Sequence, residues 1–139
     1  MCIRDSGQLE WLDDALASST SQWKVVCLHH PLYSSGRNGS TPGLADALEP
    51  VLAAHHVDLV LAGHDHHYER TAPIRGITHV VSGGGCKCTG VRPSRFTAVA
   101  DSTLQFLHVD VDGDRLTTRC IRPNGTLADR FELRAREGR

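Results

Sequence analysis

Short apolar runs alternate with polar segments along the chain, and the pattern predicts a mixed α/β fold. Residues 25–28 and 57–62 are two such runs, each with the length and composition of a buried strand. Between them lies an amphipathic stretch that ends near His55. The order is therefore strand, helix, strand, and a right-handed crossover of this kind makes the two strands parallel.

Further elements are expected on either side of this βαβ unit. Leucines at helical spacing predict a helix from Gln8, and a capping box of Asp46 and Glu49 places the start of the second helix at Asp46. The Asp112-Gly113 turn predicts a hairpin. The fold class is thus α/β, a βαβ unit followed by an antiparallel β meander. The later strands are expected at residues 77–82, 96–100, 104–111, 115–121 and 126–133.

Histidines come directly after both strands of the βαβ unit, at the point where each strand ends. His29 and His30 come after the first strand, and His64 and His66 come after the second. Parallel strands have their carboxyl ends at one edge of the sheet, so the rings of His29, His64 and His66 should converge there. Neutral imidazole is a strong nitrogen ligand, and the pattern predicts a metal site at this edge.

A long loop after the first strand is expected to shape a binding pocket. Residues 29–43 are rich in Gly, Ser and Pro and exceed the usual strand-to-helix connection of about 2–6 residues. Arg37 and Asn38 are its polar side chains for an anion. Other histidines receive a plainer interpretation: His79 lies within a predicted strand and is treated as structural, whereas His55 is expected at the surface of a helix end.

Composition narrows the class of protein. A chain of 139 residues favours one domain. A formal net charge of −1 provides no polybasic surface for nucleic acid or anionic lipid, and no apolar run approaches the roughly 20 residues of a membrane helix. Five cysteines form no regular disulfide framework. Residues 1–6 differ in character from the rest of the chain and are interpreted as an artefactual leader, which leaves residues 7–139 as the domain.

Two motifs carry a resemblance to a known family. H-H-P-L-Y at residues 29–33 and G-H-D-H-H-Y-E-R at residues 63–70 together resemble the calcineurin-like metallophosphoesterases, in the purple-acid-phosphatase-like branch. The resemblance implies an α/β/β/α sandwich with two divalent or trivalent metal ions, Fe, Zn or Mn, at the strand ends. It implies hydrolysis of phosphate esters by a hydroxide that bridges the metals, and it is compatible with a secreted or periplasmic location.

The resemblance also assigns residues to the metal centre. It implies that His29 and His64 are ligands of one metal and that His66 is a ligand of the other. His30 occupies the variable place in the first motif, so it is expected beside the ligands rather than among them.

Substrate contacts are assigned to the neighbouring loop residues. Arg37, Asn38 and His67 are expected to face the phosphate ester. Related sequences often carry histidine at the place of Asn38, and an amide can donate a hydrogen bond but cannot act as an acid near neutral pH. No general acid is identified.

The sequence also departs from the family pattern. The motifs D-x-H, G-D-x-x-D or G-D-x-x-Y, and G-N-H-D or G-N-H-E, which supply the other metal ligands, do not occur in it. The chain is therefore interpreted as the C-terminal half of a metallophosphoesterase domain, with little or no activity by itself. One sheet of a sandwich would then expose an apolar face, through which copies of the chain could associate.

Two alternatives remain open at this point. The first is a non-catalytic zinc-binding module that uses His29, His64 and His66 with Cys86 or Cys88, because nitrogen and sulfur ligands favour zinc. The second is a structural domain whose histidines bind nothing.

Overall fold

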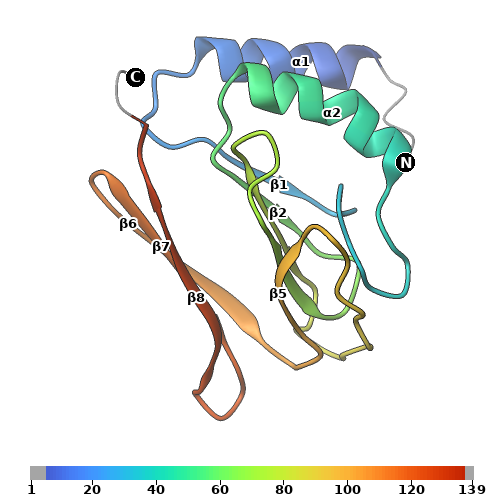
Figure 1. Cartoon of the computed structure of the whole chain (residues 1–139). Coiled ribbons are helices and arrows are strands. Elements are labelled where there is room, and N and C mark those ends of the chain that lie inside the picture. Colours follow the sequence, from blue (N-terminus) through green and yellow to red (C-terminus); the bar gives the residue numbers. More distant parts are fainter. Residues whose placement is uncertain (1–5, 137–139) are drawn as a thin grey trace.

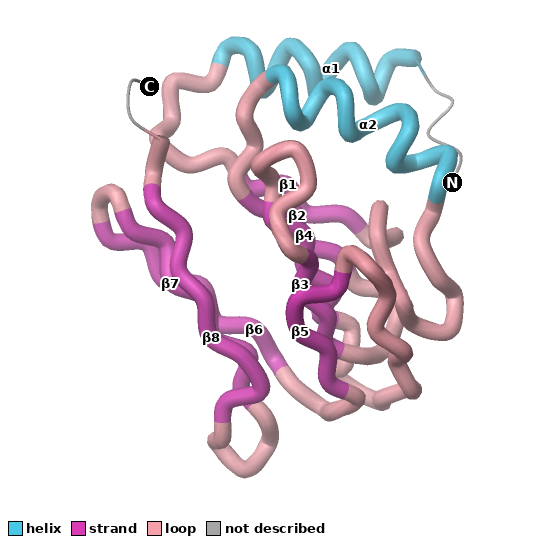
Figure 2. Tube along the Cα trace, viewed as in Figure 1, coloured by secondary structure: helices cyan, strands magenta, loops and turns pink. Residues whose placement is uncertain are grey.

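The computed structural model describes residues 6–136 and arranges them in three layers (Figure 1). Two helices cover one face of a five-stranded sheet, and a three-stranded sheet lies on the other side (Figure 2). The predicted combination of a parallel βαβ unit and an antiparallel meander is confirmed. Residues 1–5, most of the expected leader, lie outside the described part of the chain.

The βαβ unit forms as its apolar pattern predicts. Helix α1 (Ser6–Ser18) precedes strand β1 (Val25–Leu28), and helix α2 (Pro42–Ala54) connects β1 to strand β2 (Leu59–Ala62). The two strands are parallel over four pairs, from Val25 opposite Leu59 to Leu28 opposite Ala62. Both strands therefore end at the same edge of the sheet, where the two histidine segments begin.

The predicted start of α2 at Asp46 is wrong. The helix begins at Pro42 after Thr41, and no side-chain hydrogen bond caps it. Proline suits the first turn of a helix because its fixed φ is already helical and its missing N–H is not needed there. Asp46 is consequently an exposed residue inside the helix, and Glu49 accepts a hydrogen bond from the Tyr33 hydroxyl at 2.6 Å.

The five-stranded sheet contains one strand that the sequence pattern did not predict. Its order is β1-β2-β4-β3-β5, with β3 at Tyr68–Thr71, β4 at Thr78–Ser82 and β5 at Thr97–Asp101. Strand β4 is parallel to β2, whereas β3 runs antiparallel between β4 and β5. Strand β3 escaped prediction because it is part of the motif after Gly63 and carries charged residues on both of its faces.

The meander packs its inner face against this sheet. Strands β6 (Phe106–Asp112), β7 (Arg115–Ile121) and β8 (Leu127–Arg134) form the second sheet. Leu116 and Cys120 of β7 are fully buried and join the cluster of Leu59, Tyr68 and Val80. The two sheets therefore cover each other. Large apolar side chains stay exposed elsewhere: Phe106 and Val111 of β6 and Trp11 of α1 are each more than half exposed.

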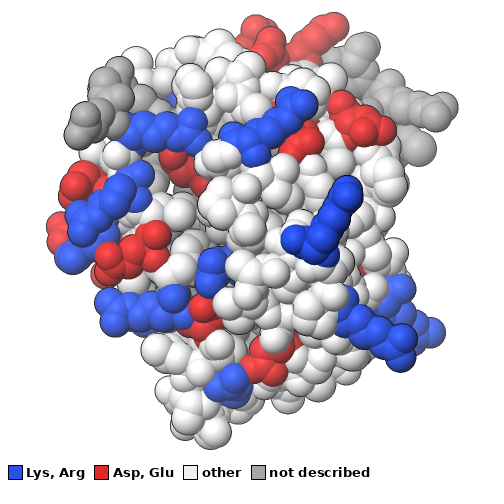
Figure 3. Space-filling view, viewed as in Figure 1, with Lys and Arg blue, Asp and Glu red and all other residues white. Residues whose placement is uncertain are grey.

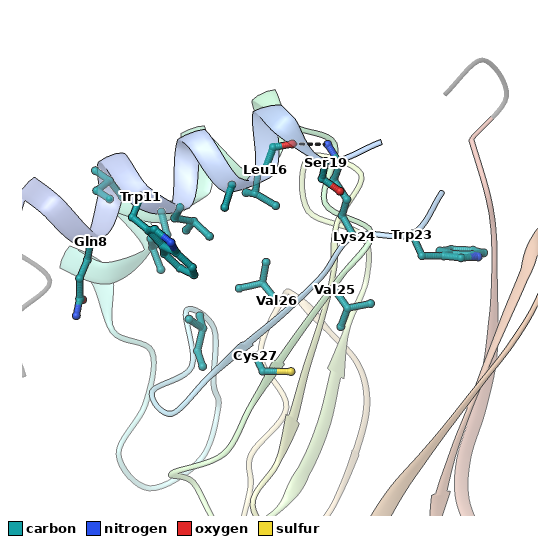
Figure 4. A pocket seen from close by; sticks show the side chains of 14 residues that line it. Gln8, Trp11, Leu16, Ser19, Trp23, Lys24, Val25, Val26 and Cys27 are labelled. Carbon is teal, nitrogen blue, oxygen red and sulfur yellow. Dashed lines mark hydrogen bonds between the residues drawn. The ribbon is translucent and has the colours of Figure 1, made fainter. Parts of the chain in front are cut away.

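The helices bury the opposite face of the five-stranded sheet. Apolar side chains of α2, such as Leu48 and Leu52, pack on Val26 and Val60. At the outer side of β1, a hollow of about 570 Å³ opens between this strand and α1. Figure 4 shows Trp11 and Val25 beside it, together with the hydrogen bond from the Lys24 ammonium to the Leu16 carbonyl at 2.8 Å.

Charge on the surface is mixed rather than segregated. On the face drawn in Figure 3, acidic and basic side chains alternate over the meander and no extended region carries a single sign. Among the described residues, neither helix has the length and hydropathy needed to cross a membrane.

Candidate metal centre

Three histidine rings meet at the carboxyl ends of β1 and β2. The Nε2 atom of His29 lies 3.2 Å from the Nδ1 atom of His64. One ring nitrogen from each of His29, His30 and His64 lies within 4.8 Å of the other two. Convergence of His29 and His64 was predicted from strand spacing. Participation of His30 was not, because alternation along an extended chain would turn successive side chains to opposite sides.

The backbone explains how these rings come together. The amide of Gly63 donates to the carbonyl of His29 at 3.1 Å, which joins the two loops directly after their strands. His64 has a φ of 64°, a left-handed conformation that is uncommon for a residue with a side chain. Such strain typically occurs at functional sites, where the surrounding structure holds it in place. Here the conformation redirects the chain so that the His64 ring faces the end of β1.

The lowered pKa of His30 favours metal binding by this ring. Partial desolvation, with the neighbouring His64 and His29 rings, lowers the pKa of His30 below its ordinary value. Neutral imidazole is the form that binds a metal ion. The donor set therefore fits a metal of zinc-like preference, because three nitrogen ligands are available from one small region.

His66 lies apart from this cluster. It lines a separate pocket of about 210 Å³ with Arg37, Asn38, Lys87 and Thr89. The amide of Thr89 donates to the His66 carbonyl at 2.7 Å, which ties the segment after β4 to the histidine motif. The structure thus places His66 beside two basic side chains and does not bring it to the other three rings.

Asp65 anchors the loop that carries Arg37. Its buried carboxylate accepts hydrogen bonds from the Ser34 hydroxyl at 2.5 Å, the backbone N–H of Asn38 at 2.9 Å and the side-chain Nδ2 of Asn38 at 2.8 Å. Burial alone would raise the pKa of Asp65, but these hydrogen bonds outweigh it and lower the pKa. Asn38, predicted to contact substrate, therefore also has a structural role in this loop.

His67 and Glu69 form a second buried network beneath the loop. The His67 ring is fully buried, and its Nε2 lies 3.1 Å from a Glu69 oxygen. Ser35 donates to Glu69 through its amide and its hydroxyl, each at 2.7 Å. Burial opposes ionisation, yet the hydrogen bonds from His67, Thr97 and Ser35 lower the pKa of Glu69. His67, predicted to face substrate, is thus enclosed by protein.

The cysteines of the alternative hypothesis do not join the histidines. Cys86 and Cys88 are exposed and free, and the three-histidine cluster found within residues 6–136 contains no thiol. Lys87, between them, is instead the residue that reaches a candidate site. The C-K-C sequence drew attention to its cysteines, and only the fold shows that its lysine lies near His66.

Comparison with known proteins finds a family that the first half of the chain resembles. The family model described as Calcineurin-like phosphoesterase matches residues 3–68, which include the histidines of both motifs. Over these residues, a little under half of its length, the chain is similar to this family. The resemblance inferred from the two motifs is therefore confirmed.

Individual proteins that are similar in sequence narrow the resemblance. Purple acid phosphatase 3 of Arabidopsis thaliana is 42% identical over 80 residues, covering 57% of this chain and 22% of the plant protein. An uncharacterised protein of Mycobacterium tuberculosis is 40% identical over 130 residues, covering 81% of this chain and 24% of the mycobacterial protein. The chain is therefore similar to purple acid phosphatases and spans about a quarter of the length of these relatives.

The three-dimensional structure agrees with this relationship. The purple acid phosphatase PPD1 of yellow lupin superimposes with a TM-score of 0.85 at 26% identity, covering 94% of this chain and 28% of the lupin chain. Almost the whole described fold, including the meander, thus has a counterpart in a purple acid phosphatase.

Proposed function

We propose that this chain forms part of a metal-dependent phosphoester hydrolase and contributes ligands to its metal centre. The observation that carries the proposal is the 3.2 Å approach of His29 Nε2 and His64 Nδ1 at the ends of two parallel strands in a chain that resembles the calcineurin-like phosphoesterases. Two ring nitrogens at this separation suit a common ion.

The proposed roles combine the family resemblance with the position of each residue. His29 and His64 hold one metal ion, and His66, in its separate pocket, serves a second. Bound metal ions supply Lewis-acid chemistry, which lowers the pKa of water and polarises phosphoryl oxygens. The buried carboxylates Asp65 and Glu69 keep the histidine motif and the Arg37 loop in register with each other.

The phosphate ester binds in the pocket beside His66. Arg37 and Lys87 both line this pocket, and neither has a carboxylate partner in the part of the chain that the structure describes. Two cations without ion-pair partners attract an anionic phosphate, and guanidinium can bind it through two hydrogen bonds. Asn38 shapes the pocket wall through its bonds to Asp65, and His67 supports the same loop from beneath.

Hydrolysis is proposed as a property of the whole protein rather than of residues 7–139 alone. One ion would have two imidazole ligands and the other ion only one. Both would be incompletely coordinated, because catalytic metal ions as a rule have at least three protein ligands. Additional ligands would come from a preceding part of the domain.

The test compares hydrolysis of p-nitrophenyl phosphate by this chain and by a version extended with the upstream reading frame, each supplied with zinc, iron or manganese. We expect activity only in the extended protein, and a loss of about 100-fold or more in kcat/KM for H29A and H64A. H108A, which removes an exposed histidine of β6, is the matched control. Equal activity of the two chains, or full activity of H64A, would refute the proposal.

A further inference from the structure

We infer that His30 is a third ligand of the ion held by His29 and His64, so that three imidazoles of this chain bind one ion. Family resemblance places His30 beside the ligands, and the geometry points to a different role. The inference concerns metal binding alone, so it does not depend on the proposed hydrolysis.

Distances between the donors fit a shared ion. Two nitrogens bound at about 2.0–2.1 Å to a tetrahedral ion lie roughly 3.3 Å apart. His29 Nε2 and His64 Nδ1 lie 3.2 Å apart. One ring nitrogen from each of His29, His30 and His64 lies within 4.8 Å of the other two. The third donor is therefore near enough for an ion to draw the three rings together.

The orientations of the rings agree with this arrangement. The planes of His29 and His30 meet at 85°, those of His29 and His64 at 71°, and those of His30 and His64 at 47°. Three rings that surround one point must be inclined to one another, whereas parallel stacking would direct their nitrogens side by side. The inclined rings leave their nitrogens free to converge.

The end of β1 makes the pairing of neighbouring residues possible. Strand β1 finishes at Leu28, and His29 and His30 lie in a bend. Consecutive side chains point to opposite faces only while the chain is extended. The bend removes this restriction, so His29 and His30 can approach His64 from the same side.

The donor set defines what the site would bind. Within residues 6–136, the cluster contains three imidazoles and neither carboxylate nor thiolate. Such a set suits Zn²⁺, Co²⁺ or a similar borderline ion rather than Mg²⁺ or Ca²⁺, which prefer oxygen ligands. Three protein ligands leave a fourth position open, which is characteristic of catalytic rather than structural zinc sites.

The experiment measures metal affinity of the chain itself, without substrate. Zn²⁺ binding is determined by competition with a chelator for the wild type and for H30A, H66A and H108A. We expect one tightly bound ion in the wild type and a dissociation constant at least 10-fold higher in H30A. H66A should retain the affinity of this site within about threefold, and H108A within twofold.

A second measurement observes the ligand directly. In ¹⁵N-resolved spectra of the histidine rings, one nitrogen each of His29, His30 and His64 should shift when Zn²⁺ is added, and inorganic phosphate should not reproduce the shift. Thermal unfolding without metal checks that H30A is folded. Unchanged affinity in H30A, an equal loss in H66A and H30A, or absence of binding by the folded wild type would overturn the inference. Absence of hydrolysis would leave it intact.

Discussion

The five-stranded sheet and the meander differ in how they use polar residues. Within the five-stranded sheet and the loops at its carboxyl edge, Asp65, Glu69 and His79 are buried, and His64 adopts a left-handed backbone. In the meander, β6 and β7 pair without interruption over seven residues, and ion pairs within it, such as Arg115 with Asp112, lie exposed. The pairing of β6 with β7 is regular, whereas the edge of the five-stranded sheet contains buried polar groups and an unusual backbone conformation. This difference is expected where the meander supports a functional site that the sheet edge forms.

The largest contrast is expected between two glutamates. Glu69→Ala removes a buried carboxylate that pairs with His67 and accepts from Ser35, which leaves those donors without partners. We expect a loss of about 3–5 kcal/mol in the free energy of unfolding. Glu132→Ala in β8 removes a surface pair with Arg130 at 3.6 Å and should cost less than about 0.5 kcal/mol. Urea unfolding of both variants measures the difference, and equal losses would remove the contrast.

A change of pH should affect the sheet through His79. Burial lowers the pKa of this ring from 6.5 to about 4, and neither ring nitrogen has a hydrogen-bond partner among the described residues. The unfolded chain therefore takes up a proton at a higher pH than the folded one. His79 contributes its full stability above pH 6.5, and about 3 kcal/mol is lost as the pH falls from 6.5 to 4. Stability of His79→Leu, measured across this range, should depend less on pH; an unchanged slope would contradict the assignment.

Substitution of two glycines, one in each region, compares how much space each region leaves for a side chain. A Cβ at Gly83 would lie 2.1 Å from the carbonyl oxygen of Asp65, so Gly83→Ala must displace the backbone of the histidine motif. We expect a loss of about 1–3 kcal/mol, together with weaker Zn²⁺ binding. At Gly113 in the meander, nothing lies within 4 Å, and only its φ of +55° opposes alanine, at about 1 kcal/mol. Metal affinity of Gly113→Ala should be unchanged, which distinguishes the two sites.

The smallest expected effect concerns the junction between the sheets. The Tyr68 hydroxyl of β3 donates to Asp129 of β8 at 2.7 Å, and Arg70 Nε donates to the same carboxylate at 2.6 Å. Tyr68→Phe should cost about 1 kcal/mol, because Asp129 keeps its arginine partner. Thermal unfolding should remain a single transition. A separate early transition of the meander would show that this junction carries more of the coupling than one hydrogen bond.

Sequence patterns identified the regular parts of this molecule and missed the parts governed by tertiary contacts. Strands β1 and β2 were found because apolar runs bounded by glycine and histidine have few other interpretations, and their parallel pairing followed from the helix between them. Strand β3 was missed since its Glu69 is buried by partners from residues 35 and 97, which no local pattern reveals.

Some residues of the candidate site could likewise be predicted from the sequence, and others could not. Proximity of His29 and His64 follows from topology alone, and the motifs around them indicated the family. His30 joins them only because the chain bends after Leu28, and Lys87 approaches His66 only because Thr89 bonds to the His66 carbonyl. Each depends on a loop conformation that hydrophobic periodicity does not encode.

The hydrogen bond from Gly63 to the carbonyl of His29 has a consequence for the speed and cost of metal capture. Because it joins the two histidine loops in the folded chain, most of their conformational entropy is lost during folding and little remains to be lost when an ion arrives. Ion capture should consequently be limited by dehydration of the ion rather than by loop closure.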